Sequence, residues 1–288
     1  NLYKSKNGFN YDCIVPVTGS GDSYFLIHLV KNILKLNPLV VHYNHYFNTK
    51  IGIKNLSNLR TIFDVDILIQ NVNPNSVKKI TRTTLDNFGS IYWHVIAGQT
   101  AFPVQTAITH KIPLILWGAN QGLEQVGMFS HKDEVEMTRR YRKEHDLLGF
   151  EADDLLSIFD TLSENDIWQY RYPSEKNLLS LGVRNIYLGN FFRWDPKSQH
   201  EFVIKTYNYK TMQHNRTFYN YDHTDCFNYM NLHDLIKYLK HGYSKVSDHL
   251  CREIRHKRIS REEALKVEKY YQTKNPEFLK HFCQWLEI

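Results

Sequence analysis

Apolar and polar positions alternate along the first half of the chain in a way that predicts strands and helices in turn. Short apolar runs predict buried strands at residues 13–18, 38–45, 66–72 and 111–117. Between them, apolar residues recur at helical spacing over residues 24–34, 52–63, 76–88 and 91–110. Strands that alternate with helices predict an α/β fold, with a parallel sheet and flanking helices.

The pattern changes near residue 139, after which helical and loop-rich segments dominate. One helical stretch is predicted over residues 232–240, and another follows Ser260, which can form a capping box with Glu263. We therefore predict two domains. Residues 1–165 would form the α/β domain, and residues 166–288 would form a mainly helical C-terminal region that contacts a substrate or a partner.

A loop of small residues joins the first predicted strand to the helix after it. Its residues are Thr18, Gly19, Ser20, Gly21, Asp22 and Ser23. In such a loop the backbone N–H groups of the turn and of the helix start point at one spot, where the helix dipole favours an anion. The loop lacks the Gly-Lys-Ser/Thr ending of a Walker loop and the Gly-x-Gly-x-x-Gly spacing of a dinucleotide site. We predict that these six residues bind phosphate groups.

Two further loops end at the same edge of the predicted sheet, because the carboxyl ends of parallel strands lie together. Asn44 and His45 follow the second strand, and Gly118 and Asn120 follow the fourth. Each loop alone is typical of a turn, whereas the three together predict a nucleotide site. Asn44 and His45 would contact adenine or ribose, although a histidine at a strand end is as often a packing residue.

Asp22 is the acidic residue of the phosphate loop. A carboxylate beside bound phosphates is repelled unless a cation lies between them. Asp22 therefore either caps the helix or holds Mg²⁺ on the released pyrophosphate. We predict Asp22 as a metal ligand and a catalytic residue.

Composition narrows the class of protein. The chain is 42% hydrophobic and 23% charged, as in ordinary globular proteins, and its apolar runs are too short to span a bilayer, so we expect no membrane insertion. Four widely spaced cysteines fit a reducing cytoplasm. The net charge of +6 comes without a Lys/Arg run, so we do not expect a nucleic-acid partner. A polyphosphate or an anionic sugar as substrate would explain the same excess of positive charge.

The phosphate loop resembles the Ser-Gly-Gly-x-Asp-Ser loop of the PP-loop ATP pyrophosphatases, which cleave ATP between the α- and β-phosphates. Longer stretches resemble one branch of these enzymes, the N-acetyl sugar amidotransferases. This branch acts in the biosynthesis of lipopolysaccharide and flagellar-glycan sugars of the pseudaminic- and legionaminic-acid type. The similar stretches are residues 11–23, 117–121, 136–142, 187–190, 194–195 and 233–243, followed by Asp248, Ile254, Arg255 and 261–264.

The resemblance implies an ATP-dependent amidotransferase that uses Mg²⁺. Such an enzyme adenylates the carbonyl oxygen of a sugar's N-acetyl group, and ammonia then replaces that oxygen to give an acetamidino sugar, AMP and pyrophosphate. The substrate would be an N-acetylated sugar or nucleotide-sugar. Separate glutaminase and ammonia-channel subunits would supply the ammonia.

The basic residues between 240 and 261 permit two interpretations. A mixed-charge helix face in solvent is the ordinary one. Alternatively, Arg255 or Lys240 reaches back to the active site and holds a phosphate or a sugar carboxylate, for which a guanidinium is well suited. We predict Arg255 as a catalytic residue beside Asp22.

The loop departs from the family's Ser-Gly-Gly-Lys-Asp-Ser pattern at two positions. Ser20 replaces the second glycine, and Gly21 replaces the lysine. Two other functions therefore stay open. One is a PP-loop enzyme of the tRNA-thiolation type, which would need paired cysteines. The other is a non-catalytic adenine-nucleotide-binding assembly protein, which the missing lysine favours.

Overall fold

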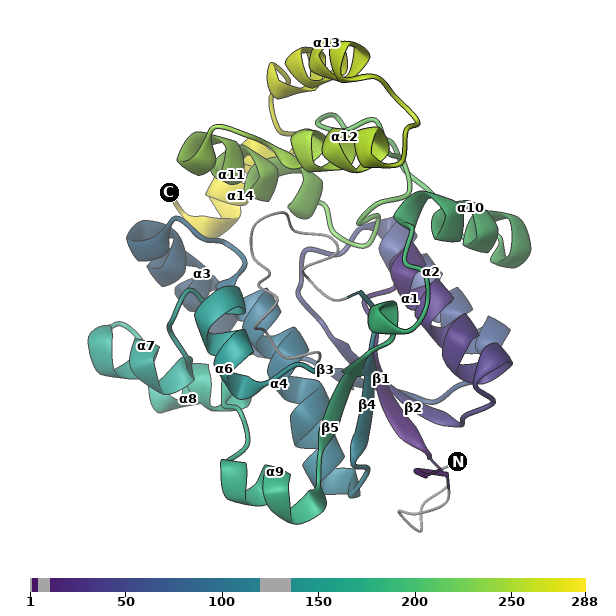
Figure 1. The fold of residues 1–288 in the computed structure, drawn as a ribbon. Helices are drawn as coiled ribbons and strands as arrows, with labels where there is room; N and C mark the ends of the chain where they lie inside the picture. The colour runs from purple at the N-terminus through teal and green to yellow at the C-terminus, as the bar shows by residue number, and fades with distance from the viewer. Residues whose placement is uncertain (1, 5–10, 120–135) are drawn as a thin grey trace.

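Five parallel strands form the central sheet. The computed structural model describes residues 2–4, 11–119 and 136–288. The strands are β1 (Cys13–Pro16), β2 (Pro38–Tyr43), β3 (Ile67–Gln70), β4 (Leu114–Trp117) and β5 (Arg184–Tyr187). They pair in the order β3-β2-β1-β4-β5, so the chain moves outward from β1 first on one side and then on the other (Figure 1). The predicted parallel α/β sheet is confirmed.

Helices cover both faces of the sheet because successive side chains of a buried strand point to opposite sides. Cys13 and Val15 of β1 pack into a core with α1 (Gly21–Ile27) and α2 (Lys50–Phe63). Ile14, between them, packs into a second core with α4 (Trp93–His110). The helices predicted at 52–63, 76–88 and 91–110 are present as α2, α3 (Pro74–Phe88) and α4, and the one predicted at 24–34 is α1 continued by a π-helical segment, His28–Ile33.

The strand β5 was not predicted, and it extends the sheet beyond β4. It lies after residue 165, where we expect the first domain to end. Helix α10 (Pro196–Tyr207) follows it and packs against α1, with Val203 in the same core as β1. The sheet and its flanking layer thus include residues from both predicted domains, and the boundary itself stays a prediction.

Short helices connect β4 to β5, and the C-terminal residues form a layer of helices above the carboxyl edge of the sheet (Figure 1). The connecting helices are α6 (Arg139–Tyr141), α7 (Ala152–Ile158), α8 (Glu164–Ile167) and α9 (Glu175–Leu181). The C-terminal helices are α11 (Asp234–His241), α12 (Lys245–Arg255), α13 (Arg261–Gln272) and α14 (Leu279–Leu286). The capping box of Ser260 and Glu263 opens α13 as predicted.

The last helix of the chain returns to the first half of the fold. Phe282 and Leu286 of α14 are buried in one cluster with Phe47 and Ile91. Arg82 of α3 donates a hydrogen bond to the carbonyl oxygen of Leu286. The C-terminal layer is therefore held to the α/β part by packing as well as by hydrogen bonds.

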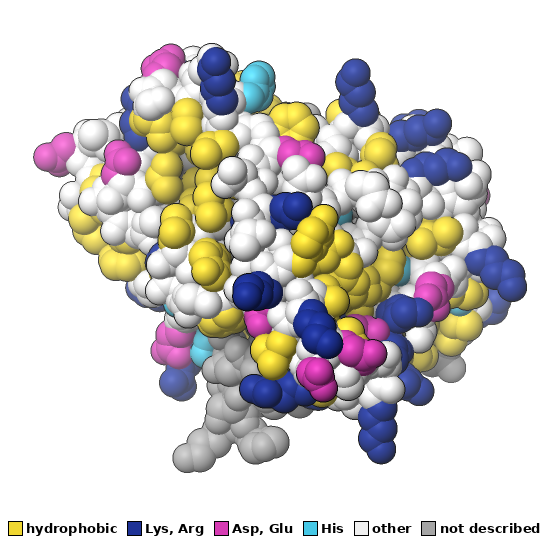
Figure 2. Space-filling model, turned by 90° about the horizontal axis from the view of Figure 1, so that it is seen from above, with side chains coloured by type: hydrophobic (Ala, Val, Ile, Leu, Met, Phe, Trp, Pro, Cys, Tyr) yellow, Lys and Arg dark blue, Asp and Glu magenta, His cyan; other side chains and the backbone are white. Residues whose placement is uncertain are grey.

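Charged side chains are dispersed over the outer face of the C-terminal layer. Figure 2 shows lysine and arginine side chains spread over this face among acidic and apolar ones. None of the helices in the described part of the chain combines the length and the apolar character that crossing a bilayer needs.

Candidate active site at the carboxyl edge of the sheet

A cavity of about 570 Å³ lies between the phosphate loop and the C-terminal helices. Thr18, Ser20, Asp22 and Ser23 line it on the side of β1. The opposite side includes residues of α11 and α12 and of the segment before them: His223, Asp225, Tyr229, His233, Lys237, Lys240 and Lys245. This volume is typical of sites for small ligands.

The phosphate loop is held in a tight conformation by its own side chains. The amide of Thr18 donates to Ser23 Oγ at 3.0 Å, and the amide of Ser20 donates to Thr18 Oγ1 at 3.3 Å. Gly19 has a φ of +90°, which side chains rarely adopt, and a Cβ there would lie 3.1 Å from the Cβ of Leu56. Glycine is thus required at position 19 for both reasons.

The loop leaves backbone donors available to a ligand. Within the described residues, the amides of Gly19, Gly21 and Asp22 have no hydrogen-bond acceptor. The cap residue of α1 is Ser20, whose side chain accepts no capping hydrogen bond. These donors lie at the start of α1, where the sequence predicts an anion cradle, and backbone amides in this position suit phosphate oxygens.

Asp22 does not cap the helix, because it is the second residue of α1 and its side chain points elsewhere. Its Oδ1 accepts a hydrogen bond from the Gln199 amide of α10 and lies 4.0 Å from His200 Nε2. Burial, followed by the charge of Asp222, raises the pKa of Asp22 to about 7, while the Gln199 hydrogen bond and Arg252 act in the opposite direction. A carboxylate in this setting gains from a nearby cation, and its role as a metal ligand stays a prediction.

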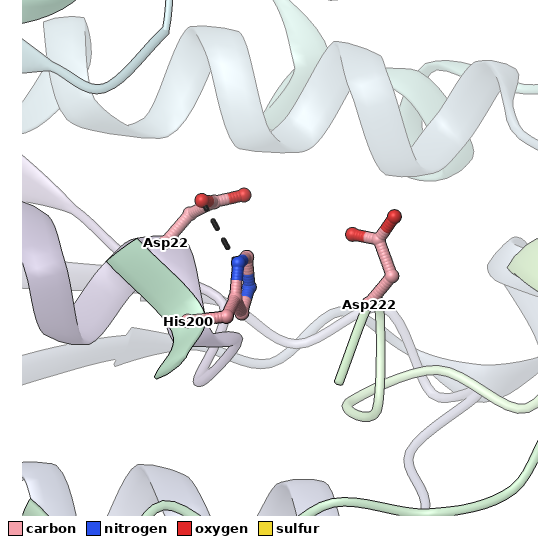
Figure 3. A group of neighbouring side chains, drawn as sticks. All are labelled: Asp22, His200 and Asp222. Atoms are coloured by element: carbon pink, nitrogen blue, oxygen red, sulfur yellow. Dashed lines mark ion pairs between the residues drawn. The ribbon is translucent and has the colours of Figure 1, made fainter. Parts of the chain in front are cut away.

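Two residues that sequence reasoning missed lie next to Asp22. Figure 3 shows the His200 ring beside the Asp22 carboxylate, and Asp222 opposite on a loop of the C-terminal region. Each of the three residues offers one ligand atom, and these atoms lie within 4.8 Å of one another. Asp222 also accepts from His249 Nε2 at 3.0 Å, and this interaction, together with the neighbouring histidines, keeps the pKa of Asp222 well below its usual range despite burial.

The two residues predicted after the second strand have different surroundings. His45 is buried, lines the cavity, and places its Nε2 3.6 Å from Asp225 Oδ2. Asn44 does not line the cavity; its amide instead holds the loop together, donating to Asn71 Oδ1 at 2.7 Å and accepting from the Tyr46 amide at 3.1 Å. The structure brings His45 to the site and gives Asn44 a role in the turn.

The loop after β4 also reaches the cavity. Gly118 lines it, and a Cβ at this position would lie 3.2 Å from the Trp194 ring. Asn120, the other residue predicted here, lies outside the described residues.

The structure does not bring Arg255 to the site. It is exposed near the end of α12 and does not line the cavity. Arg252, one turn earlier on the same helix, is the arginine whose charge acts on Asp22. Lys240, the other basic residue considered, lines the cavity and donates to the Phe88 carbonyl at 2.8 Å.

Lysines make the far wall of the cavity basic. Lys245 Nζ donates to the Tyr229 hydroxyl at 2.8 Å, and Lys237 pairs with Asp248. His233 lies among them, and burial, reinforced by the charges of Lys245 and Lys237, holds its pKa well below the usual range. Asp225 and Asp248 lie on the same wall, so its three lysines leave an excess of one positive charge.

Fold and site together define a doubly wound α/β protein whose predicted phosphate loop lies where the strand order reverses, between β1 and β4. Residues 214–288 match the family model of the C-terminal domain of WbpG-like lipopolysaccharide (LPS) biosynthesis proteins. Over these residues the match confirms the resemblance to a family of lipopolysaccharide biosynthesis. The same residues supply the basic wall of the cavity.

Two other proteins are similar to this chain, one in sequence over a short stretch and one in structure over most of the chain. A stretch of 66 residues is 36% identical to the uncharacterized protein MJ1599 of Methanocaldococcus jannaschii, and it covers 23% of this chain and 24% of that protein. The solved structure of U34-tRNA thiolase NcsA from Methanococcus maripaludis, with its 4Fe-4S cluster, is similar at 14% identity and a TM-score of 0.38, over 87% of this chain and 74% of that one. A structural likeness at this level carries no conclusion about chemistry.

Proposed function

We propose that the protein is an ATP-dependent amidotransferase that converts the N-acetyl group of a sugar into an acetamidino group during surface-glycan biosynthesis. One observation carries the proposal. The cavity has an anion cradle with available amides on one side, and its other side is built from the residues that match a domain of lipopolysaccharide biosynthesis. A triphosphate and a sugar can thus be held against each other in one space.

ATP would be held by the phosphate loop. Ser20 and Asp22 line the cavity, and the Ser20 hydroxyl and the Asp22 amide would donate to phosphate oxygens together with the neighbouring amides of Gly19 and Gly21. Mg²⁺ would be held by the carboxylate of Asp22 and would offset the charge of the released pyrophosphate. His45 and the loop at Gly118 would border the nucleoside.

The basic wall would hold the sugar. Lys237, Lys240 and Lys245 favour a substrate with negative charge, either a sugar carboxylate or the diphosphate of a nucleotide-sugar. An amide is a poor electrophile, and its oxygen becomes a good leaving group once it is bonded to AMP. The task of the protein is then to fix the amide oxygen in line with the α-phosphate.

Ammonia would come from separate glutaminase and channel subunits. Cys226 is the cysteine that lines the cavity, and burial, followed by the charge of Asp225, raises the pKa of its thiol to about 12. A thiol that stays protonated is a poor nucleophile, and this argues against Cys226 as a glutaminase nucleophile. The four cysteines at positions 13, 226, 251 and 283 have no paired spacing, which speaks against the thiolation-type enzyme.

The proposal is tested by exchange of labelled pyrophosphate into ATP, with a panel of N-acetylated sugars and nucleotide-sugars. We expect sugar-dependent exchange, and AMP release when ammonium is added. Asp22→Ala should abolish turnover and leave the fold intact by circular dichroism. Asp86→Asn, at an exposed aspartate of α3, is the matched control and should keep full activity. Tight ATP binding without exchange across the panel would instead indicate the non-catalytic binding protein.

A further inference from the structure

We propose that Asp22, His200 and Asp222 bind a divalent transition-metal ion, such as Mn²⁺ or Zn²⁺, and do so without nucleotide. The three residues come from α1, α10 and the loop before α11, so a bound ion would join the phosphate loop to the C-terminal region (Figure 3). This inference goes beyond the proposed function and does not depend on the identity of the sugar.

The orientation of His200 suits metal binding. Its Nδ1 lies 2.6 Å from the carbonyl oxygen of Pro196, so this nitrogen carries the proton of the neutral ring. Nε2 then presents its lone pair on the side of Asp22. The ring also stacks on Tyr221, with centroids 4.5 Å apart and an interplanar angle of 22°. A fixed tautomer and a fixed ring are what a metal-binding histidine needs.

Asp222 is oriented in the same manner. Its Oδ2 accepts from His249 Nε2 at 3.0 Å, and His249 Nδ1 lies 2.8 Å from Thr217 Oγ1. The side chains of Asp222, His249 and Thr217 are all buried. The carboxylate is thus held toward Asp22, although two carboxylates at this range repel each other.

A separate observation also points to a cation. Gln199 is 3% exposed, and its amide nitrogen donates to Asp22. Its Oε1 is buried and has no hydrogen-bond donor among the residues that the structure describes. A buried amide oxygen without a donor is costly, and a metal ion or a metal-bound water beside Asp22 would satisfy it.

The lack of a side chain at Gly21 leaves room for the His200 ring. A Cβ at position 21 would lie 2.2 Å from His200 Cδ2 and 2.6 Å from Nε2, so any side chain there would displace the imidazole. Because the ring lies against the start of α1, an ion bound to it would place positive charge next to the anion cradle. Such an ion would favour phosphate binding in the loop.

The donor set decides the class of metal. One imidazole with two carboxylates suits Mn²⁺, Zn²⁺ or Co²⁺, whereas Mg²⁺ and Ca²⁺ prefer oxygen ligands throughout. The ion proposed here therefore differs from the Mg²⁺ that would accompany ATP.

The test is a titration of the chelator-treated chain with MnCl₂ alone, with free Mn²⁺ followed by electron paramagnetic resonance. We expect one Mn²⁺ per chain, weakened about 10-fold or more by Asp222→Asn and by His200→Gln. Asp86→Asn should bind as the wild type does, and millimolar Mg²⁺ should not displace the ion. Circular dichroism checks that each variant is folded.

A second readout needs no variant. Pulsed electron paramagnetic resonance of the bound Mn²⁺ should show coupling to one imidazole nitrogen. Absence of binding by both Mn²⁺ and Zn²⁺, or a bound Mn²⁺ without nitrogen coupling, would overturn the inference. Because neither measurement contains ATP or sugar, failure of the proposed function would leave this result unaffected, and the reverse also holds.

Discussion

Replacement of Gly21 by alanine should destabilise the protein through a single contact. The added methyl carbon would lie 2.2 Å from His200 Cδ2, far inside the separation of about 3.5–4.0 Å at which carbon atoms pack. His200 cannot withdraw freely, because its Nδ1 is bonded to the Pro196 carbonyl and its ring is stacked on Tyr221. Gly21 does not have a positive φ, so the backbone adds no strain of its own.

The expected loss follows from these facts. Overpacking of a well-packed site costs about 1–3 kcal/mol, and alanine recovers at most about 1 kcal/mol of helix propensity relative to glycine. With the full gain in propensity subtracted, we expect Gly21→Ala to lower the free energy of unfolding by up to about 2 kcal/mol.

A double-mutant cycle by urea denaturation, in buffer with a chelator, isolates the contact. His200→Ala removes the ring, so Gly21→Ala should cost almost nothing in that background. Gly182→Ala is the control, since its φ of +69° makes it costly but a Cβ there would meet nothing within 4 Å. Its cost should be the same in both backgrounds. An equal loss from Gly21→Ala with and without the His200 ring would refute the reasoning.

Two further predictions concern buried polar groups. Arg142 is fully buried, donates to Thr100 Oγ1 at 2.7 Å and pairs with Glu151 at 3.2 Å. Arg142→Met should therefore lower the free energy of unfolding, measured by urea denaturation, by about 3–5 kcal/mol. A loss below about 1 kcal/mol would contradict the structural role of Arg142. Burial lowers the pKa of His42 to about 4 and that of His94 to about 3. As the pH falls, these two histidines are protonated in the unfolded chain before they are protonated in the folded one. Their contribution to the free energy of unfolding should therefore be complete above pH 6.5 and be lost as the pH drops toward 4. For His42 alone the loss at pH 5 is about 2 kcal/mol, and His42→Asn should flatten the pH dependence of the urea midpoint by that amount.

The first four strands and the helices between them could be predicted from sequence, because buried parallel strands are nearly continuous apolar runs. The strand β5 could not. Its residues Arg184, Asn185, Ile186 and Tyr187 are half polar, since β5 is the last strand of the sheet and its outer side meets only an isolated antiparallel bridge, from Glu136 to Ile186, among the described residues. What places it in the sheet is pairing with β4, which lies far away in sequence.

The phosphate loop was predictable for a local reason, and its neighbours were not. Thr18 to Ser23 are consecutive, so one stretch of sequence contains the whole cradle. His200 and Asp222 reach Asp22 only through the packing of α10 on α1 and the return of the C-terminal region. The signal that could have pointed to α10 is Pro196 directly after Asp195, which begins that helix.

The exposed position of Arg255 could have been predicted from the helical periodicity of α12. Val246, Leu250 and Glu253 are buried on one side of α12. At 3.6 residues per turn, Arg255 lies half a turn from Val246 and therefore points away from the protein. Arg252 lies at the flank of the buried side, from which its charge reaches Asp22.

The return of α14 to α3 has a consequence for the order of events during synthesis. The phosphate loop leaves the ribosome early, whereas Arg82 and Leu286, which join the C-terminal layer to the α/β part, are 204 residues apart. Contacts of such separation form late, because a long loop must close first. A nascent chain can therefore assemble its first four strands while their carboxyl edge is still open to solvent. The complete ligand-binding cavity should form only after Leu286 has left the ribosome. Until then the uncovered carboxyl edge of the sheet is a surface to which chaperones can bind.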